Sequence, residues 1–142
     1  MKKRFLVGIA AAAAIVVSIP ARAEFVVIVH PKNPVTSLSA EHVAQYFLGK
    51  SASFPGGAAV TPLNLAEGTA LRDEFYAKVA DKNPGQVKAY WAKQMFSGKG
   101  SPPKELASAA ELKKAVANDP SAIGYIEKSA VDATVKGVLT IQ

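Results

Sequence analysis

The sequence contains no cysteine among its 142 residues. This absence excludes disulfide bridges, thiolate nucleophiles, cysteine metal sites and a lipid attached through an N-terminal cysteine. Histidine is also scarce: His30 and His42 are the only two, and neither has a metal ligand four residues further along a helix. A Gly-x-Ser-x-Gly nucleophile motif is missing as well. We therefore expect no catalytic residues, no metal site and no cofactor.

The net charge is concentrated at the start of the chain. The formal charge is +6, and the first 23 residues hold four cations, Lys2, Lys3, Arg4 and Arg22, and no acid. Without them the formal charge falls by four to +2. A charge this small gives no reason to expect nucleic acid or an acidic membrane surface as a partner.

Residues 1–23 have the pattern of a secretory signal peptide: a basic start, an apolar middle and a small-x-small end at Ala21 and Ala23. A membrane anchor is the alternative, because residues 5–21 carry no charge. The alanine-rich composition and Pro20 beside the processing site favour a cleaved signal, with cleavage after Ala23. We expect residues 24–142 to form one domain without a stable membrane anchor, located in the periplasm.

Hydrophobic patterning predicts alternating strands and helices. The continuous β-branched run at residues 24–31 is typical of a strand buried on both faces. Further strands are predicted at 58–65, 121–126 and 135–141, and helices after Ser39, after Thr69, at 83–96 and at 108–119. The order β, α, β, α, α, α, β, β favours an α/β layered domain with a mixed sheet flanked by helices.

The predicted helices have recognisable starts and apolar faces. Ser39 is a candidate N-cap, and the pairs Asn83–Gln86 and Ser108–Glu111 have the spacing of capping boxes. The predicted apolar residues are Val43, Tyr46, Phe47 and Leu48; Leu71, Phe75 and Val79; Val87, Tyr90, Trp91 and Met95; and Leu112 and Val116. Residues 97–103 are predicted to form a loop.

The Gly68–Thr69 junction before the second predicted helix has two possible interpretations. A helix N-terminus presents N–H groups without intrahelical partners, and their dipoles favour an approaching anion. Glycine allows close approach to the backbone, and Thr69 adds a hydroxyl. The same pair is also typical of an ordinary helix cap. Spacing alone favours the cap, because caps are far more common than anion sites.

Four phrases in order resemble the periplasmic phosphate-binding proteins of ABC transporters. They are "AQYFLGKSASF", "AEGTALRDEFYAKV", "AYWAKQMFSGKG" and "DPSAIGYIEKSAV". The resemblance extends from about Val26 to Val138. It implies a type 2 periplasmic-binding fold, and the length leaves room for one three-layer lobe, where full members have two.

The resemblance also implies where a ligand would bind. The Gly-Ser-Gly-Thr turn of the family corresponds to residues 66–69, so Gly68 and Thr69 match while Glu67 replaces the serine. The arginine that the family places before this turn falls near Leu63. Residues Gly68, Thr69, Ala70, Arg72 and Ser39 are therefore the expected ligand-binding set, with Arg72 as the substitute cation.

Three hypotheses follow. The first is a solute-binding-type protein that binds phosphate or a similar small oxyanion and works with an ABC permease. The second is an adaptor that keeps the lobe, has lost the ligand and binds another periplasmic protein. The third is a homodimer in which two copies rebuild a cleft.

Overall fold

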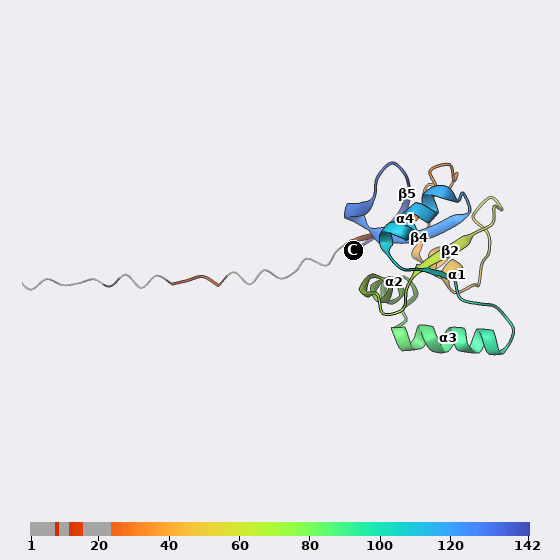
Figure 1. The fold of residues 1–142 in the computed structure, drawn as a ribbon, viewed down its shortest axis with the longest axis horizontal. Coiled ribbons are helices and arrows are strands. Elements are labelled where there is room, and N and C mark those ends of the chain that lie inside the picture. Colours follow the sequence, from red (N-terminus) through yellow and green to blue (C-terminus); the bar gives the residue numbers. More distant parts are fainter. Residues whose placement is uncertain (1–7, 9–11, 16–23) are drawn as a thin grey trace, which may run out of the picture.

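The computed structural model describes residues 8, 12–15 and 24–142, with the fold formed by residues 24–142 (Figure 1). The predicted signal peptide and its cleavage site lie almost wholly outside the described residues and stay predictions. The elements are β1 (Phe25–Val29), α1 (Ala40–Phe47), β2 (Thr61–Leu65), α2 (Ala70–Ala80), α3 (Pro84–Phe96), β3 (Lys104–Leu106), α4 (Ala109–Asn118), β4 (Ala122–Glu127), a 3₁₀ turn (Lys128–Ala130) and β5 (Lys136–Ile141). Within the described residues, no helix is long and apolar enough to cross a membrane.

The five strands form one mixed sheet in the order β3-β2-β4-β1-β5. Strand β1 runs antiparallel to both β4 and β5, whereas β2 runs parallel to β3 and β4. All five residues of β1 are buried, as its continuous apolar run predicts. The predicted mixed sheet is confirmed.

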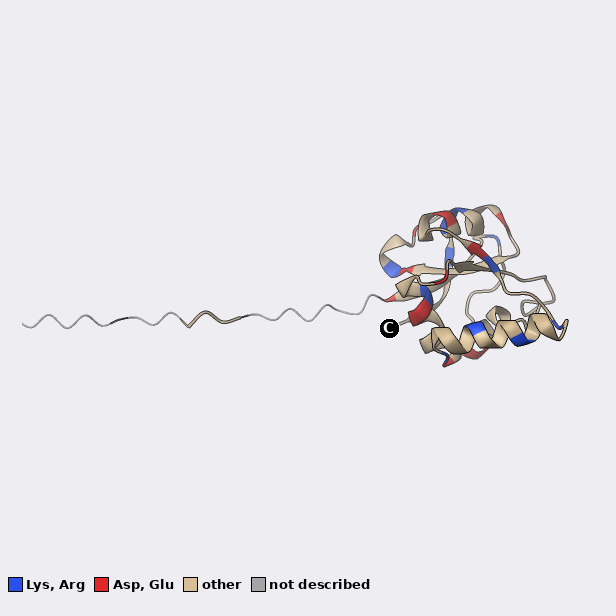
Figure 2. Cartoon of the chain, turned by 60° about the horizontal axis from the view of Figure 1, so that its bottom comes forward, with Lys and Arg blue, Asp and Glu red and all other residues tan. Residues whose placement is uncertain are grey.

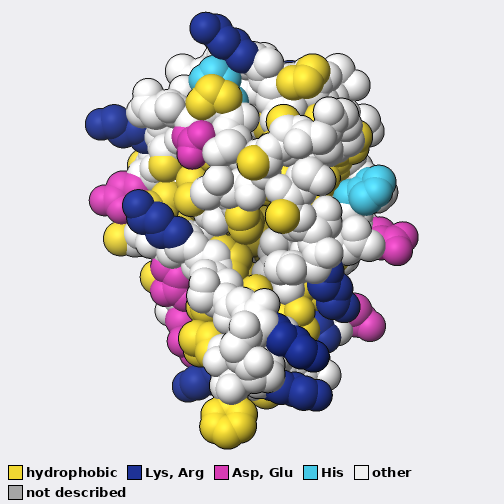
Figure 3. Space-filling view, turned by 90° about the vertical axis from the view of Figure 1, so that its right-hand side faces the viewer, with side chains coloured by type: hydrophobic (Ala, Val, Ile, Leu, Met, Phe, Trp, Pro, Cys, Tyr) yellow, Lys and Arg dark blue, Asp and Glu magenta, His cyan; other side chains and the backbone are white. Residues whose placement is uncertain are grey.

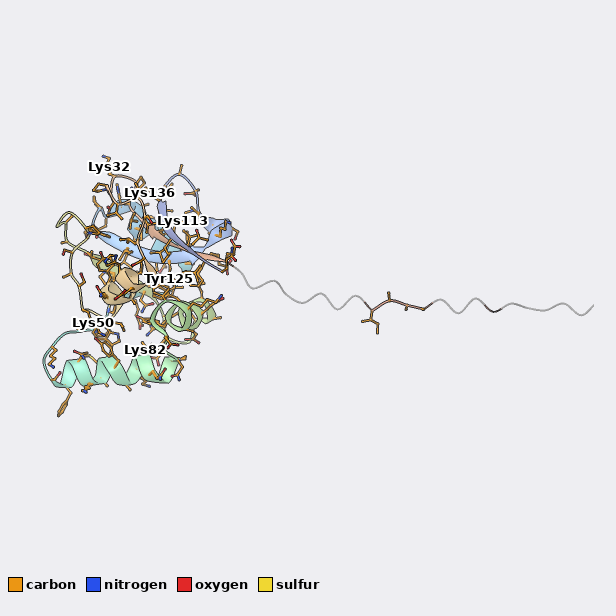
Figure 4. All side chains as sticks on the ribbon, turned by 180° about the vertical axis from the view of Figure 1, so that it is seen from behind. Lys32, Lys50, Lys82, Lys113, Tyr125 and Lys136 are labelled. Atoms are coloured by element: carbon orange, nitrogen blue, oxygen red, sulfur yellow. The ribbon has the colours of Figure 1, made fainter. Side chains whose placement is uncertain are left out.

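Helices cover both faces of the sheet, and β4 shows how the layers meet. At Gly124 an added Cβ would lie 2.4 Å from Leu112 Cδ2, so α4 packs directly on the backbone of this face. The next residue, Tyr125, points to the opposite face and stacks on Phe75 of α2 with ring centroids 4.0 Å apart. Tyr125 lies between the sheet and the helices in Figure 4. The result is a helix–sheet–helix sandwich, with α3 outside α2 (Figure 1).

The predicted helix starts are largely confirmed. Ser39 accepts a hydrogen bond from His42 N (3.1 Å), and Asn83 and Gln86 form a complete capping box. Ser108 accepts from Glu111 N, but the Glu111 carboxylate reaches Ala107 N in place of the cap residue itself. Residues 97–103 form a loop, as predicted.

The predicted apolar faces are confirmed except at the outer helix. Val87 and Trp91 of α3 are buried and Tyr90 is half-buried, whereas Met95 is 53% exposed. Helix α3 lies outside α2 at the edge of the domain. Its C-terminal turn therefore extends past the neighbouring elements, and Met95 stays exposed. The two cationic residues of α3 and its lack of acids are visible in Figure 2.

The sequence prediction missed β3. This strand has three residues, of which Lys104 and Glu105 are charged and exposed. Among the described residues it pairs only with β2, and the paired residues of β2 are Leu63 to Leu65. So short a segment has no hydrophobic period that reveals it, because long-range pairing alone makes it a strand.

Candidate functional site

The candidate site begins where β2 ends, and a buried polar network fixes that end. Asn64 is 2% exposed; its side-chain amide donates to Tyr76 Oη (2.9 Å), and its carbonyl oxygen accepts from Leu65 N (2.9 Å) and from the Tyr125 hydroxyl. Tyr76 belongs to α2 and Tyr125 to β4. Hydrogen bonds of the Asn64 side chain therefore connect the C-terminal end of β2 to α2 and to β4.

Burial raises the pKa of both tyrosines in this network. The pKa of Tyr76 is raised to about 12, mainly by desolvation, although the nearby Arg72 cation and the hydrogen bond from Asn64 oppose the rise. Burial likewise raises the pKa of Tyr125 well above its usual range. Both hydroxyls are therefore neutral donors or acceptors at physiological pH, which the network requires.

The turn between β2 and α2 adopts the geometry that Gly68 allows. Gly68 has a φ of 89°, in the left-handed region that favours glycine. Thr69 occupies the N-cap position of α2, but its hydroxyl makes no capping bond and donates to Ala66 O (2.6 Å). The predicted cap position is confirmed, while the side-chain bond expected there is not formed.

The first turn of α2 leaves its amides available. The first backbone amide of the helix to bond within it is that of Asp73, which donates to Thr69 O (3.1 Å). The N–H groups of Ala70, Leu71 and Arg72 precede it and have no intrahelical acceptor. Gly68 and Ala70 are exposed, so a small anion can approach these amides from solvent.

Arg72 lies at this turn, but a carboxylate already pairs with it. Its Nη1 donates to Leu65 O (2.9 Å) at the end of β2 and to Glu105 Oε1 (2.5 Å) of β3. The Arg72 side chain is 12% exposed and that of Glu105 47%. The guanidinium folds back towards the end of β2, as the substitute cation would need to, and the Glu105 carboxylate already accepts a hydrogen bond from it.

The two departures from the family turn have clear positions. Glu67 is exposed, and its carboxylate lies 3.9 Å from Lys88 Nζ of α3, a distance that gives a weak surface pair. Leu63 is 6% exposed inside β2 and supplies no charge. The turn thus has one exposed carboxylate, and Leu63 leaves no charge at the position where the resemblance places an arginine.

Ser39 does not join the other predicted site residues. Its hydroxyl caps α1, and the preceding Leu38 donates its N–H to Val138 O of the edge strand β5 (3.0 Å). Two strands, β1 and β4, separate β5 from β2. With about 4.8 Å between neighbouring strands, β5 lies about 14 Å from β2. The expected set therefore splits into Gly68, Thr69, Ala70 and Arg72 at one place and Ser39 at another.

The histidines take structural positions. His30 follows β1, and its Nδ1 accepts from Lys32 N (3.0 Å), while His42 is exposed on α1. Among the described residues, no group of three or more His, Asp or Glu side chains is placed to bind a metal ion.

The mixed five-stranded sheet with helices on both faces matches one lobe of solved periplasmic binding proteins. Solved structures match this fold over 82% of the chain. One is a Clostridium perfringens protein assigned as a phosphate ABC transporter substrate-binding protein, with bound phosphate (24% identity, TM-score 0.66). Others are an ABC-type phosphate transport receptor from Vibrio cholerae (17%, 0.64) and PstS from Borrelia burgdorferi (14%, 0.61).

The match covers one part of each of these proteins. The chain spans 45%, 46% and 47% of the three structures, in the order given. Comparison of the sequence with family models and with curated proteins gives no match. At these identities the likeness establishes the fold, and the expected single-lobe architecture is confirmed.

Sequence reasoning missed two residues that define the site. Glu105 forms the ion pair with Arg72, but it lies on the unpredicted strand β3, 33 positions further along the chain. Asn64 sits inside an apolar strand pattern, where a lone amide between Leu63 and Leu65 was the available signal for a buried network.

Proposed function

We propose that this chain is a phosphate-type solute-binding module that seats a small oxyanion at the N-terminus of α2. The observation that supports this proposal is the first turn of α2. The backbone N–H groups of Ala70, Leu71 and Arg72 begin this helix beside a solvent-exposed glycine turn. The fold of the module is shared with proteins described as phosphate-binding. In this proposal the module works in the periplasm beside an ABC permease or another periplasmic protein.

The proposed affinity for phosphate is weak. Micromolar binding requires about 8 kcal/mol. Hydrogen bonds to a charged group contribute about 1.5–3 kcal/mol each, and association itself costs at least about 4 kcal/mol. Three amides on an open lobe, with Arg72 paired and Glu67 nearby, therefore predict a dissociation constant in the millimolar range for one copy.

The test is calorimetry of phosphate binding to residues 24–142 in phosphate-free buffer, with sulfate as the comparison anion, for the parent chain and for Glu67→Ser. The serine removes a negative charge from the turn and restores the family donor, so we expect phosphate binding to tighten several-fold. Absence of phosphate heat in both proteins would reject the oxyanion function.

A ligand-free interaction module is the second candidate, and the Arg72–Glu105 pair favours it. The Glu105 carboxylate pairs with the half-buried Arg72, so this guanidinium has a partner within the chain and needs no bound anion. Under this alternative, neither the parent chain nor Glu67→Ser binds phosphate. A homodimer that rebuilds a cleft is distinguished by mass measurements over a range of protein concentrations, in which phosphate would increase the dimer fraction.

A further inference from the structure

A cavity of about 280 Å³ lies between α2, α3 and the segment that enters β3. Its apolar wall includes Tyr76, Val87, Trp91 and Met95. Tyr76 is 2% exposed and Trp91 is 7% exposed, whereas Met95 is 53% exposed, so the cavity has an aromatic interior and is open to solvent beside Met95. Small-molecule sites are commonly concave and apolar with a few polar groups, and this cavity has that composition.

The size of the cavity limits the occupant. Its volume lies just below the usual range of about 300–1,000 Å³ for ligand pockets. A cavity of about 150 Å³ accepts a benzene molecule. The space between α2 and α3 therefore suits one ring, or a branched aliphatic group of similar size, with a short polar arm. Figure 3 shows one face of the molecule, on which hydrophobic side chains run along the middle and charged side chains lie mostly at the edges.

The charges around the cavity leave one carboxylate without a partner. Arg72 pairs with Glu105 at 2.5 Å, and Lys88 lies 3.9 Å from Glu67. Asp73, in the first turn of α2, also lines the cavity and has no ion pair within the described part of the chain. The cavity wall thus has one more negative charge than positive charges, and that excess favours a cation over an anion.

The aromatic residues favour the same class of ligand. The guanidinium carbon of Arg72 already lies 5.8 Å from the centroid of the Tyr76 ring, which is cation–π distance. Trp91 has no such cation among the residues that the structure describes, although indole is the ring that binds cations best. Its buried indole N–H has no hydrogen-bond partner among the described residues. This donor favours an acceptor group, and only the face of the indole ring favours a cation.

We propose that the cavity between α2 and α3 binds a small organic cation with an aromatic or branched apolar body. The body packs against Trp91 and Met95, and the cationic group pairs with Asp73. The cavity borders the amides that open α2 and shares Glu67, Arg72 and Glu105 with that site. The cation would contact Asp73, Trp91 and Met95, and this proposal does not depend on the oxyanion function.

Trp91 allows a direct test, because it is the only tryptophan in the sequence. Its fluorescence is followed while benzylammonium, benzyl alcohol or benzoate is added at constant ionic strength. The three probes share a ring and differ in charge. We expect a saturable change in emission with benzylammonium, binding that is several-fold weaker with benzyl alcohol, and the weakest binding with benzoate. Equal or tighter binding of benzoate, or no saturable change with any probe, would overturn the proposal.

Variants locate the binding site. Asp73→Asn should weaken benzylammonium binding about five- to tenfold and leave benzyl alcohol unchanged, because only the charge is removed. Asp81→Asn is the matched control: it changes a carboxylate at the other end of α2, where asparagine tolerates the left-handed backbone (φ 53°). Ala92→Phe fills the cavity and should abolish binding of both ligands. Circular dichroism establishes folding of each variant, and unchanged benzylammonium affinity in folded Asp73→Asn or Ala92→Phe would refute the assignment.

Discussion

Replacing Glu105 with glutamine should strengthen phosphate binding, because the Glu105 carboxylate pairs with the Arg72 guanidinium that would otherwise bind the oxyanion. The Glu105 carboxylate lies 2.5 Å from Arg72 Nη1, and Arg72 also donates to Leu65 O beside the turn. Glutamine has nearly the same shape and no charge. Arg72 then becomes available to the phosphate while its own position on the strand end is retained.

The expected gain follows from one charge-assisted hydrogen bond. Such a bond contributes about 1.5–3 kcal/mol, which corresponds to about a 10- to 100-fold tighter dissociation constant at 1.4 kcal/mol per factor of ten. The cost in stability should be small, below about 1 kcal/mol, because the Glu105 side chain is 47% exposed and surface pairs contribute little.

The assay is phosphate titration by calorimetry at fixed ionic strength, with Glu74→Gln as the control. Glu74 also belongs to an ion pair, with Lys78 at 3.0 Å, but this pair lies on α2 itself and is not linked to Arg72. A phosphate affinity that stays within twofold of the parent in Glu105→Gln would refute the reasoning. An equal gain in Glu74→Gln would show that net charge, and not the freed Arg72, controls binding.

Two further predictions concern the network that holds the site. Asn64→Ala should lower the free energy of unfolding by about 3–5 kcal/mol, because it leaves two buried tyrosine hydroxyls without their partner; urea denaturation measures this, and exposed Asn118→Ala should cost less than about 1 kcal/mol. Because the pKa of Tyr76 is raised from 10 to about 12, its contribution is present in full below pH 10 and is lost as the pH rises towards 12. At pH 11 the loss should be about 1.4 kcal/mol. A stability that does not change between pH 9 and 11, or a loss just as large in Tyr76→Phe, would contradict this role.

Much of the fold could be predicted from local sequence signals. The buried strand at the start of the domain and the capping box at Asn83 both depend on nearby residues, and the structure confirms them. Strand β3 could not be predicted, because its existence depends on pairing with β2 about 40 positions earlier in the chain. Met95 was wrongly assigned to an apolar face, because helical spacing does not reveal how far the neighbouring layer extends.

The site was predictable only in part, for the same reason. Gly68 and Thr69 could be located as a helix-opening turn, since that pattern is local. The partner of Arg72 could not be predicted, because Glu105 reaches it from a distant strand. The separation of Ser39 from the turn follows from the strand order, in which β1 and β4 lie between β5 and β2. The helix-opening turn could thus be predicted from neighbouring residues. The positions of side chains from distant strands relative to that turn could not.

The most direct test of the oxyanion seat is phosphate titration of ¹⁵N-labelled residues 24–142, followed by amide resonances in two-dimensional NMR. We predict saturable shifts concentrated at Gly68, Thr69, Ala70, Leu71 and Arg72, with a dissociation constant in the millimolar range and the amide of Ser39 unaffected. Resonances of the α2 turn that stay fixed at tens of millimolar phosphate, while chloride and phosphate give identical spectra, would contradict the proposed function.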